Sequence, residues 1–479
     1  MTFAKDVSKG ALAVTAIPLL LFVSWLAYSR PGYFTSETYI AGLIGLELLA
    51  LALWRFRQVF FALLMYVFLS AGSDLPGVSF STKGRWILLG MGALAGVLIM
   101  LKERQLRLGF FHLIALSCVM AGLVSAAASR YPDLAMLKAL SLFLLFLYAA
   151  SGARIAVEGR EGRFLNGLLI GCEILVAGTA AFYAAGIEVM GNPNSLGALM
   201  GVVGIPVLLW GILTSKEAAK DTFTRNRRVV LFFLCLYLVY YSHARAGMLA
   251  AATSSALLCI GLREYKMLAK GCAVVLIMIT AAVILQPQAV SRSFSMFTSD
   301  VVYKGHEQGV LISRVSPWNE AMDTIRSHPW FGTGFGTTDN AHDSTISIGN
   351  FASNFAVTAE YGSSYLAIVA WVGIVGTLPF LLLLLLLAAP IVRTFRWMRT
   401  TGSALHPAVP LVLVVVAGLV HAGLEDWLFA VGYYLCVFFW SMAFVLVDIA
   451  PASLRASIFS FPPRPRHVQN QQQAFVAGQ

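Results

Sequence analysis

The long polar segment at residues 287–363 offers most of the side chains that could carry out chemistry. Arg314 and Trp318 lie four residues apart in it, a spacing that places both on one face of an amphipathic helix. His328 and the following Pro329 are expected to end this helix. The segment separates apolar stretches that are each long enough to span a bilayer. A protein that only crossed the membrane would have no use for such a segment, so we expect the chemistry here.

Glycines and proton-accepting groups follow the predicted helix. Gly332, Gly334 and Gly336 are expected to let the backbone turn tightly and approach a ligand. His342 and Glu360 lie farther along the same segment, and either side chain could take a proton from a hydroxyl group near neutral pH. The segment thus combines a guanidinium group, aromatic rings and candidate bases.

Two more polar groups stand where apolar stretches begin. Asn194 or Ser195, in the motif that starts at Asn192, is expected to cap a helix whose first-turn amides point at an anion. A turn with a cap and no ligand is the alternative. Ser242 and Arg245 lie in a very short turn, and an arginine near the membrane core must be paired or must await an anion.

A further polar corner contains His421, Glu425 and Asp426. His421 and Glu425 are four residues apart and could share a helix face. A salt-bridged corner with a structural role is therefore an alternative to a role in binding.

The elements that must position these residues are membrane helices. Hydrophobic residues make up 58% of the chain and charged residues 12%, which indicates an integral membrane protein. The apolar runs are continuous, which predicts helices rather than barrel strands. We expect an all-α polytopic bundle of about 12 to 14 transmembrane helices with one large periplasmic loop that contains short helices. The apolar spans lie near residues 11–28, 38–54, 57–72, 85–101, 107–127, 134–150, 164–186, 194–213, 228–243, 246–262, 267–286, 364–388, 407–424 and 427–448.

This pattern divides the chain into parts. They are N-terminal transmembrane helices at 1–186, central helices at 187–286, the large periplasmic loop at 287–363, C-terminal helices at 364–448 and a disordered cytoplasmic tail at 449–479.

The distribution of positive charge predicts orientation. Most of the 34 Lys and Arg residues, Arg227 and Arg228 among them, fall on one side of the predicted spans, which marks that side as cytoplasmic. The large loop is therefore expected outside. The net charge of +11 is then explained by contact with anionic lipid head groups, so we expect no nucleic acid partner. The six cysteines lie in apolar spans without paired spacing, so no disulfide framework or metal cluster is expected.

These features resemble the O-antigen ligase and O-antigen polymerase superfamily of bacterial membrane glycosyltransferases. The resemblance covers roughly residues 190–445. It is carried by Asn192-Pro193-Asn194 with Gly197, Ser242 to Arg245 with Gly247, Arg314 with Trp318, His328-Pro329, the three loop glycines, and Tyr365-Leu366 with Gly373 and Gly376.

The resemblance implies a metal-independent, inverting transfer of a glycan from undecaprenyl diphosphate to an acceptor hydroxyl, at the periplasmic face of the bacterial inner membrane. It implies no nucleotide sugar and no cofactor, and the acceptor would be another glycan or a lipid A core. Membrane lipids and other polysaccharide-assembly proteins are the further expected partners. Arg245 and Arg314 would clamp the diphosphate, since the planar fork of arginine suits phosphate oxygens. The expected substrate-binding residues are Asn192, Asn194, Ser242, Trp318, His328, Gly334, Tyr361 and His421.

The sequence departs from the family pattern at the general base. Many members have a histidine just before the Tyr-Leu pair, where this chain has Glu360, Tyr361 and Gly362. His342 and Glu360 are ranked first as the catalytic base, and His328 and His421 are the other candidates.

The choice within this enzyme class lies between a polymerase, slightly favoured by a C-terminal pattern like that of exopolysaccharide-associated members, and a ligase. A transporter or flippase of lipid-linked sugars is a third reading. It is disfavoured because the sequence shows no internal repeat and its charges are assigned to helix ends rather than mid-span.

Overall fold

The computed structural model describes residues 24–25, 28–29, 56–70, 82–102, 109–190, 192–217, 222–266, 269, 312–338 and 361–451. All regular elements within these ranges are helices, so the predicted all-α class is confirmed for the described part of the chain. They are α4 (Arg57–Ser70), α5 (Thr82–Lys102), α6 (Phe110–Ala127), α7 (Pro132–Ala150), α8 (Gly152–Val157), α9 (Glu161–Ala184), α10 (Pro193–Leu199), η1 (Met200–Gly204), α11 (Ile205–Glu217), α12 (Thr222–Tyr241), α13 (Arg245–Gly261), α16 (Ile312–Ser327), α17 (Ser364–Thr401), α18 (Ala408–Ala422) and α19 (Tyr434–Ile449). The chain divides into two compact units, Met1–Phe60 and Phe61–Gln479, and the helices from α5 onward belong to the second.

Several of these helices have the length and composition of membrane spans. Five of the described helices are long and apolar enough to cross a bilayer: Phe110–Ala127, Pro132–Val157, Glu161–Ala184, Pro193–Ser215 and Ser364–Thr401. Shorter apolar helices include α13, α18 and α19. The expected spans 11–28, 38–54 and 267–286 lie wholly or almost wholly outside the described residues, and the total of 12 to 14 stays a prediction.

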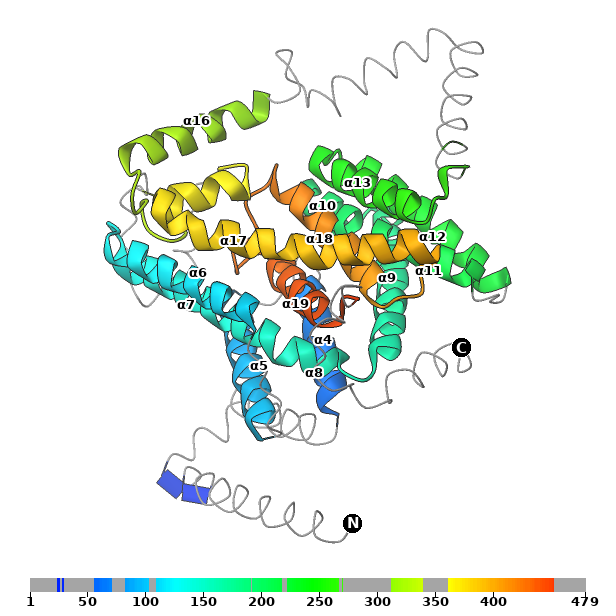
Figure 1. Cartoon of the computed structure of the whole chain (residues 1–479), viewed down its shortest axis with the longest axis horizontal. Helices are drawn as coiled ribbons and strands as arrows, with labels where there is room; N and C mark the ends of the chain where they lie inside the picture. Colours follow the sequence, from blue (N-terminus) through cyan, green and yellow to red (C-terminus); the bar gives the residue numbers. More distant parts are fainter. Residues whose placement is uncertain are drawn as a thin grey trace, which may run out of the picture. The chain divides into compact units, whose positions relative to one another are not determined.

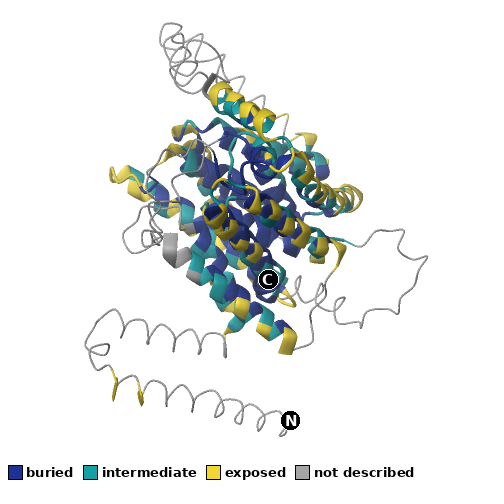
Figure 2. Cartoon of the chain, turned by 90° about the vertical axis from the view of Figure 1, so that its left-hand side faces the viewer, coloured by how far each residue is buried: buried dark blue, intermediate teal, exposed yellow. Residues whose placement is uncertain are grey.

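The outer faces of the bundle are apolar, as expected where helices meet lipid. Ile374, Leu378, Leu381 and Leu385 form an exposed stripe along α17 at helical spacing. Figure 2 shows exposed residues on the outer faces of the helices and buried residues gathered between them. With the spans above, this pattern makes the protein a multi-pass membrane protein.

A nearly fully buried helix runs through the centre of the second unit. It is formed by α10, η1 and α11 in succession, so one π-helical stretch interrupts an otherwise continuous α-helix. Gly197 faces the start of α13, where an added Cβ atom would lie 2.1 Å from the Ala244 Cβ atom. Because glycine leaves room for this approach, the start of α10 lies beside the start of α13.

Helix α17 is broken near its first third, at Gly373, which has a φ of 69°. The segment that follows α16 fills this break: the amides of Thr333 and Gly334 donate to two carbonyl groups before the break at 3.1 and 3.0 Å. After the break, the amide of Ile374 donates to the Pro329 carbonyl group at 2.8 Å. The inserted segment thus satisfies backbone groups that the break would leave unpaired. Figure 1 shows α16 alongside the first part of α17.

The corner between α18 and α19 is longer than the sequence predicted. A span was expected to begin near residue 427, but α19 begins at Tyr434, and residues 423–433 are not helical. The Leu428 carbonyl group accepts a hydrogen bond from the Trp440 indole at 2.7 Å, and the Leu428 amide donates to the Ser364 hydroxyl at 3.0 Å. These bonds hold a folded corner in place of a first helical turn.

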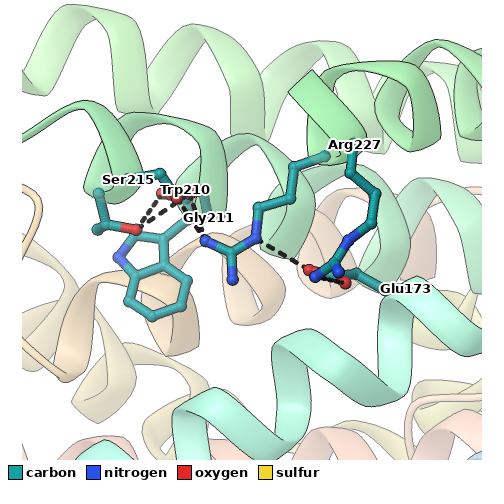
Figure 3. A network of polar contacts seen from close by, with 7 residues as sticks. Glu173, Trp210, Gly211, Ser215 and Arg227 are labelled. Atoms are coloured by element: carbon teal, nitrogen blue, oxygen red, sulfur yellow. Dashed lines mark hydrogen bonds and ion pairs between the residues drawn. The ribbon is translucent and has the colours of Figure 1, made fainter. Parts of the chain in front are cut away.

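A buried ion-pair network joins three helices at another place in the bundle. Glu173 of α9 pairs with Arg227 at 2.6 Å and with Arg228 at 2.9 Å, both from α12 (Figure 3). Arg228 also donates to the Gly211 carbonyl group at 3.1 Å and to the Ser215 hydroxyl, both on α11. Arg228, which the charge count placed on the cytoplasmic side, is therefore buried between helices and does not contact lipid head groups. The assignment of charges to helix ends alone was wrong, because Glu173 lies in the middle of its helix.

Candidate active site

Two arginines from distant parts of the sequence lie near each other. Arg245 is the first residue of α13, and Arg314 lies in the first turn of α16. The positive charge of Arg314 acts on the guanidinium group of Arg245, which shows that the two side chains are neighbours. Neither is deeply buried. Two neighbouring cations of this kind can bind a ligand that carries two negative charges.

Arg314 is already paired within the protein. Its guanidinium group forms an ion pair with the carboxylate of Glu425, 111 positions along the chain, and both side chains are 20% exposed. Gly362 packs against the same guanidinium group, since an added Cβ atom would lie 3.2 Å from Arg314 Nη1. Trp318 donates its indole N–H to the Gly362 carbonyl group at 3.4 Å. Trp318, predicted to bind substrate, is thus in contact with the turn before α17.

The start of α17 holds the corner that carries Glu425. The Ser364 amide and hydroxyl both donate to the Glu425 carbonyl group, at 3.1 and 2.7 Å. The Tyr361 amide donates to Asp426 Oδ2 at 2.8 Å, and the Tyr361 side chain is buried. The corner is therefore fixed by backbone bonds, which leaves the Glu425 side chain directed at Arg314.

His421 contacts Trp427 instead of Glu425. The Trp427 indole donates to His421 Nδ1 at 2.8 Å, and the histidine is 1% exposed. Helix α18 ends at Ala422, so His421 and Glu425 do not share a helix face as the four-residue spacing suggested. The salt-bridged corner considered from the sequence exists, but its cation is Arg314.

The motif that begins at Asn192 forms a cap whose amides are occupied. Asn192, rather than Asn194 or Ser195, is the N-cap of α10, and its side chain accepts from the Asn194 amide at 2.9 Å. The amides of Ser195 and Leu196 both donate to the Asn192 carbonyl group. The expectation that these amides point at an anion is therefore wrong for this state. The Tyr434 hydroxyl donates to the Ser195 carbonyl group at 2.8 Å and joins α19 to this cap.

Ser242 shapes the turn that presents Arg245. Its buried hydroxyl donates to the Val239 carbonyl group at 2.7 Å and accepts from the Ala244 amide at 3.2 Å. His243 between them has a φ of 51°, a conformation that non-glycine residues rarely adopt. Ser242 thus has a positioning contact within the turn, where substrate contact was predicted.

Gly334 lies close to another part of the protein. An added Cβ atom on Gly334 would lie 2.2 Å from the Ser129 hydroxyl, and the residue is buried at the break in α17. Buried Lys138 holds the same segment by donating to the Gly336 carbonyl group. The glycines do turn tightly as predicted, and the substrate contact at Gly334 stays a prediction.

The predicted bases fall in different places. His328 is exposed and follows the end of α16, about 21 Å from Arg314 along the helix axis. His342 and Glu360 lie outside the described residues, so their roles stay predictions.

Glu425, which no prediction named as a site residue, was identifiable from the sequence only as a carboxylate at the outer corner. Within the described residues, no group of three His, Cys, Asp or Glu side chains could hold a metal ion.

Fold and site together define a multi-pass membrane protein that gathers two arginines at one end of a helix bundle. Residues 230–381, about a third of the chain, match the family described as O-antigen ligase. This match confirms the resemblance to the O-antigen ligase and polymerase superfamily. It includes Arg245 and Arg314 but not Asn192, His421 or Glu425. In general terms the family supports a membrane glycosyltransferase that acts on lipid-linked glycans. No curated protein matches the chain.

Proposed function

We propose that the protein transfers a glycan from a polyprenyl diphosphate, of the undecaprenyl type, to an acceptor hydroxyl group in the synthesis of a cell-surface polysaccharide. The observation that carries the proposal is the proximity of Arg245 and Arg314 at one end of the bundle. The leaving diphosphate develops negative charge as its bond to the sugar breaks, and two arginine forks stabilise that charge.

The proposed reaction is a direct displacement at the anomeric carbon. The acceptor oxygen attacks from the face opposite the diphosphate, so the configuration inverts. The protein binds both substrates, aligns them and neutralises the leaving group, with no metal or nucleotide required. The reaction is placed at the periplasmic face of the inner membrane, where the charge distribution of the sequence puts the large loop.

We place the protein among the polymerases, which join lipid-linked repeat units, with ligation to a lipid A core as the alternative. The polymerase assignment rests on the sequence pattern after Glu425 and not on the geometry of the site. A transporter of the same lipids is disfavoured because the mid-helix charge of Glu173 is neutralised by two arginines and so offers no free charge to a substrate.

The test uses purified protein in lipid nanodiscs with synthetic lipid-linked repeat units. Longer lipid-linked chains, formed in the presence of EDTA and without nucleotide, would support a polymerase. Transfer that begins only when lipid A core is added would identify a ligase. Activity that disappears with EDTA and returns with a divalent metal would contradict the proposed chemistry, and movement of the lipid across the bilayer without a new glycosidic bond would identify a transporter.

A further inference from the structure

An exposed aromatic pair, Trp330 and Phe331, follows the end of α16. The two residues are 63% and 50% exposed, whereas residues 332–338 directly after them are buried. Their backbone is packed against α17, since a Cβ atom added to Gly373 would lie 2.3 Å from the Trp330 carbonyl group. Large apolar side chains that face outward from a fixed backbone mark a surface that contacts lipid or another molecule.

The aromatic pair lies where the lipid-facing stripe of α17 begins. This stripe starts at Ile374, directly after the break, and the Ile374 amide donates to the carbonyl group of Pro329 at 2.8 Å. Residues 374–401 form a helix about 42 Å long, which is enough to cross a hydrocarbon core of about 30 Å without the part before the break. The crossing can therefore begin beside Trp330.

Helix α6, which packs beside α17, marks the same height. Its exposed apolar stripe consists of Phe110, Leu113, Leu116, Met120 and Val124. Directly after this stripe, the Ser125 hydroxyl donates to the Trp371 carbonyl group at 2.6 Å, and the Ser129 hydroxyl donates to the Thr333 carbonyl group at 2.7 Å. The lipid-facing stripes of two helices thus end at the segment that carries the aromatic pair.

A positive charge accompanies the aromatic rings at this height. Arg130 follows Ser129 in the connection after α6, it is exposed, and its guanidinium carbon lies 5.7 Å from the centre of the Tyr131 ring. Aromatic rings and basic side chains gather at the boundary between hydrocarbon and water, where rings lie among the head groups and cations reach phosphate groups. The composition of this region therefore suits a lipid surface.

We propose that Trp330 and Phe331 insert into the head-group layer of the bilayer and anchor the end of α16 to the membrane surface. The partner is lipid because the pair continues the apolar stripe of α17. The exposed face of α16 itself carries Asp323 and Arg326 beside Met322, a mixture that suits water.

The proposed anchor lies on the same side of the membrane as Arg314. Residues 364–372, the first part of α17, extend only about 14 Å, which is less than the thickness of the hydrocarbon core. They run from Ser364, which is bonded to the Glu425 backbone, to the break beside the aromatic pair. Helix α16 is then held at both ends, by the ion pair of Arg314 with Glu425 and by lipid beyond its last turn. This lipid contact does not depend on glycan transfer.

Photo-crosslinking tests the contact directly. Benzoylphenylalanine replaces Phe331 in the full-length protein, which is placed in vesicles of phosphatidylethanolamine and phosphatidylglycerol and irradiated. Mass spectrometry should detect a phospholipid adduct, with the new bond in the part of the acyl chain close to the glycerol group.

Two positions serve as matched controls. The same replacement at Leu381, which is 51% exposed in the middle of the stripe, should give an adduct deeper in the acyl chain. At Asp323, whose side chain is 74% exposed on α16, the lipid adduct should fall to background.

A second measurement leaves the aromatic character of the pair intact. Trp330→Phe removes one indole, so the difference in fluorescence between the unmodified protein and this variant is the emission of Trp330. Lipids with bromine atoms on the acyl chain close to the head group should quench this difference emission, because bromine quenches an indole on contact. The measurement also serves if the crosslinking variant fails to fold.

The other outcomes overturn the inference. An adduct at position 331 that joins two copies of the chain would show that the aromatic pair is an interface between copies. Lipid adducts at position 381 without any at position 331 would place the pair in water. Difference emission of Trp330 that brominated lipid leaves unchanged would likewise exclude insertion into the head-group layer.

Discussion

Gly201 of η1 and Gly247 of α13 touch backbone to backbone: a Cβ atom added to Gly201 would lie 2.3 Å from the Gly247 carbonyl oxygen. No side chain can move aside to relieve such a clash, because the contact is with the main chain. The contact holds the buried central helix against the helix that begins with Arg245. Packing in the bundle interior thereby sets the position of a site residue.

Gly201→Ala is therefore expected to disrupt this packing. We predict a loss of folded protein in the membrane, or an unfolding temperature lowered by several degrees, together with a loss of glycan transfer. Gly178→Ala is the matched control, because a Cβ atom at that helical position in α9 meets nothing within 4 Å. Fluorescence-detected size-exclusion chromatography with a temperature series measures the amount of folded protein and the unfolding temperature. Equal values of these two quantities in the two variants would contradict the packing argument.

The two neighbouring arginines, Arg245 and Arg314, are the basis of a second prediction. Arg245→Lys and Arg314→Lys should each lower glycan transfer by about a hundredfold while the amount of protein in the membrane stays nearly unchanged, because lysine keeps the charge but loses the bidentate fork. Arg326→Lys on the same helix as Arg314 is the control, since that side chain is 74% exposed and pairs only with neighbouring Asp323 among the described residues. Near-normal transfer by both of the first two variants would refute the clamp.

His421 is predicted to act as a donor and a packing partner rather than a base. In His421→Gln the amide oxygen can still accept the Trp427 N–H, and the amide nitrogen can still donate, so we expect turnover within about tenfold of the unmodified protein. His421→Leu leaves the buried indole without an acceptor, which costs about 1–3 kcal/mol of stability. Steady-state transfer and thermal unfolding distinguish the two effects. Complete inactivity of a well-folded glutamine variant would mean that the ring has an acid or base role.

His406, in the connection between α17 and α18, gives the fold a dependence on pH. Burial lowers its pKa from 6.5 to about 4, and its Nδ1 atom accepts the Ala408 amide at 3.1 Å. Between these values the unfolded chain binds a proton that the folded chain excludes, so stability is full above pH 6.5 and falls as the pH falls toward 4. The unfolding temperature should drop over this range, and less so in His406→Asn. An identical drop in that variant would assign the effect to other groups.

The orientation in the membrane is predicted from charge alone. A reporter that is active only outside the cytoplasm should be active when fused after Gly309 and silent when fused after Thr224, because the Lys and Arg residues gather on the side of the second position. The reverse result would place both arginines of the site at the cytoplasmic face and would exclude a periplasmic reaction.

The sequence alone determined the helical class and the approximate place of most described membrane helices, because a backbone in lipid must satisfy its hydrogen bonds within each continuous apolar run. It also singled out Arg245 and Arg314 as candidates, since arginines on the predicted outer face are unusual.

Only the tertiary structure decided the partners of these residues. The pairing of Arg314 with Glu425 joins positions 111 residues apart, and the insertion of the Gly334 segment into the break at Gly373 joins two elements whose local patterns show no sign of each other. Local periodicity reports which residues share a helix face, so it predicted a ligand near the loop glycines and a shared face for His421 and Glu425. Contacts between distant segments depend on how the helices pack. That packing inserts the glycine segment into the break in α17 and pairs Glu425 with Arg314.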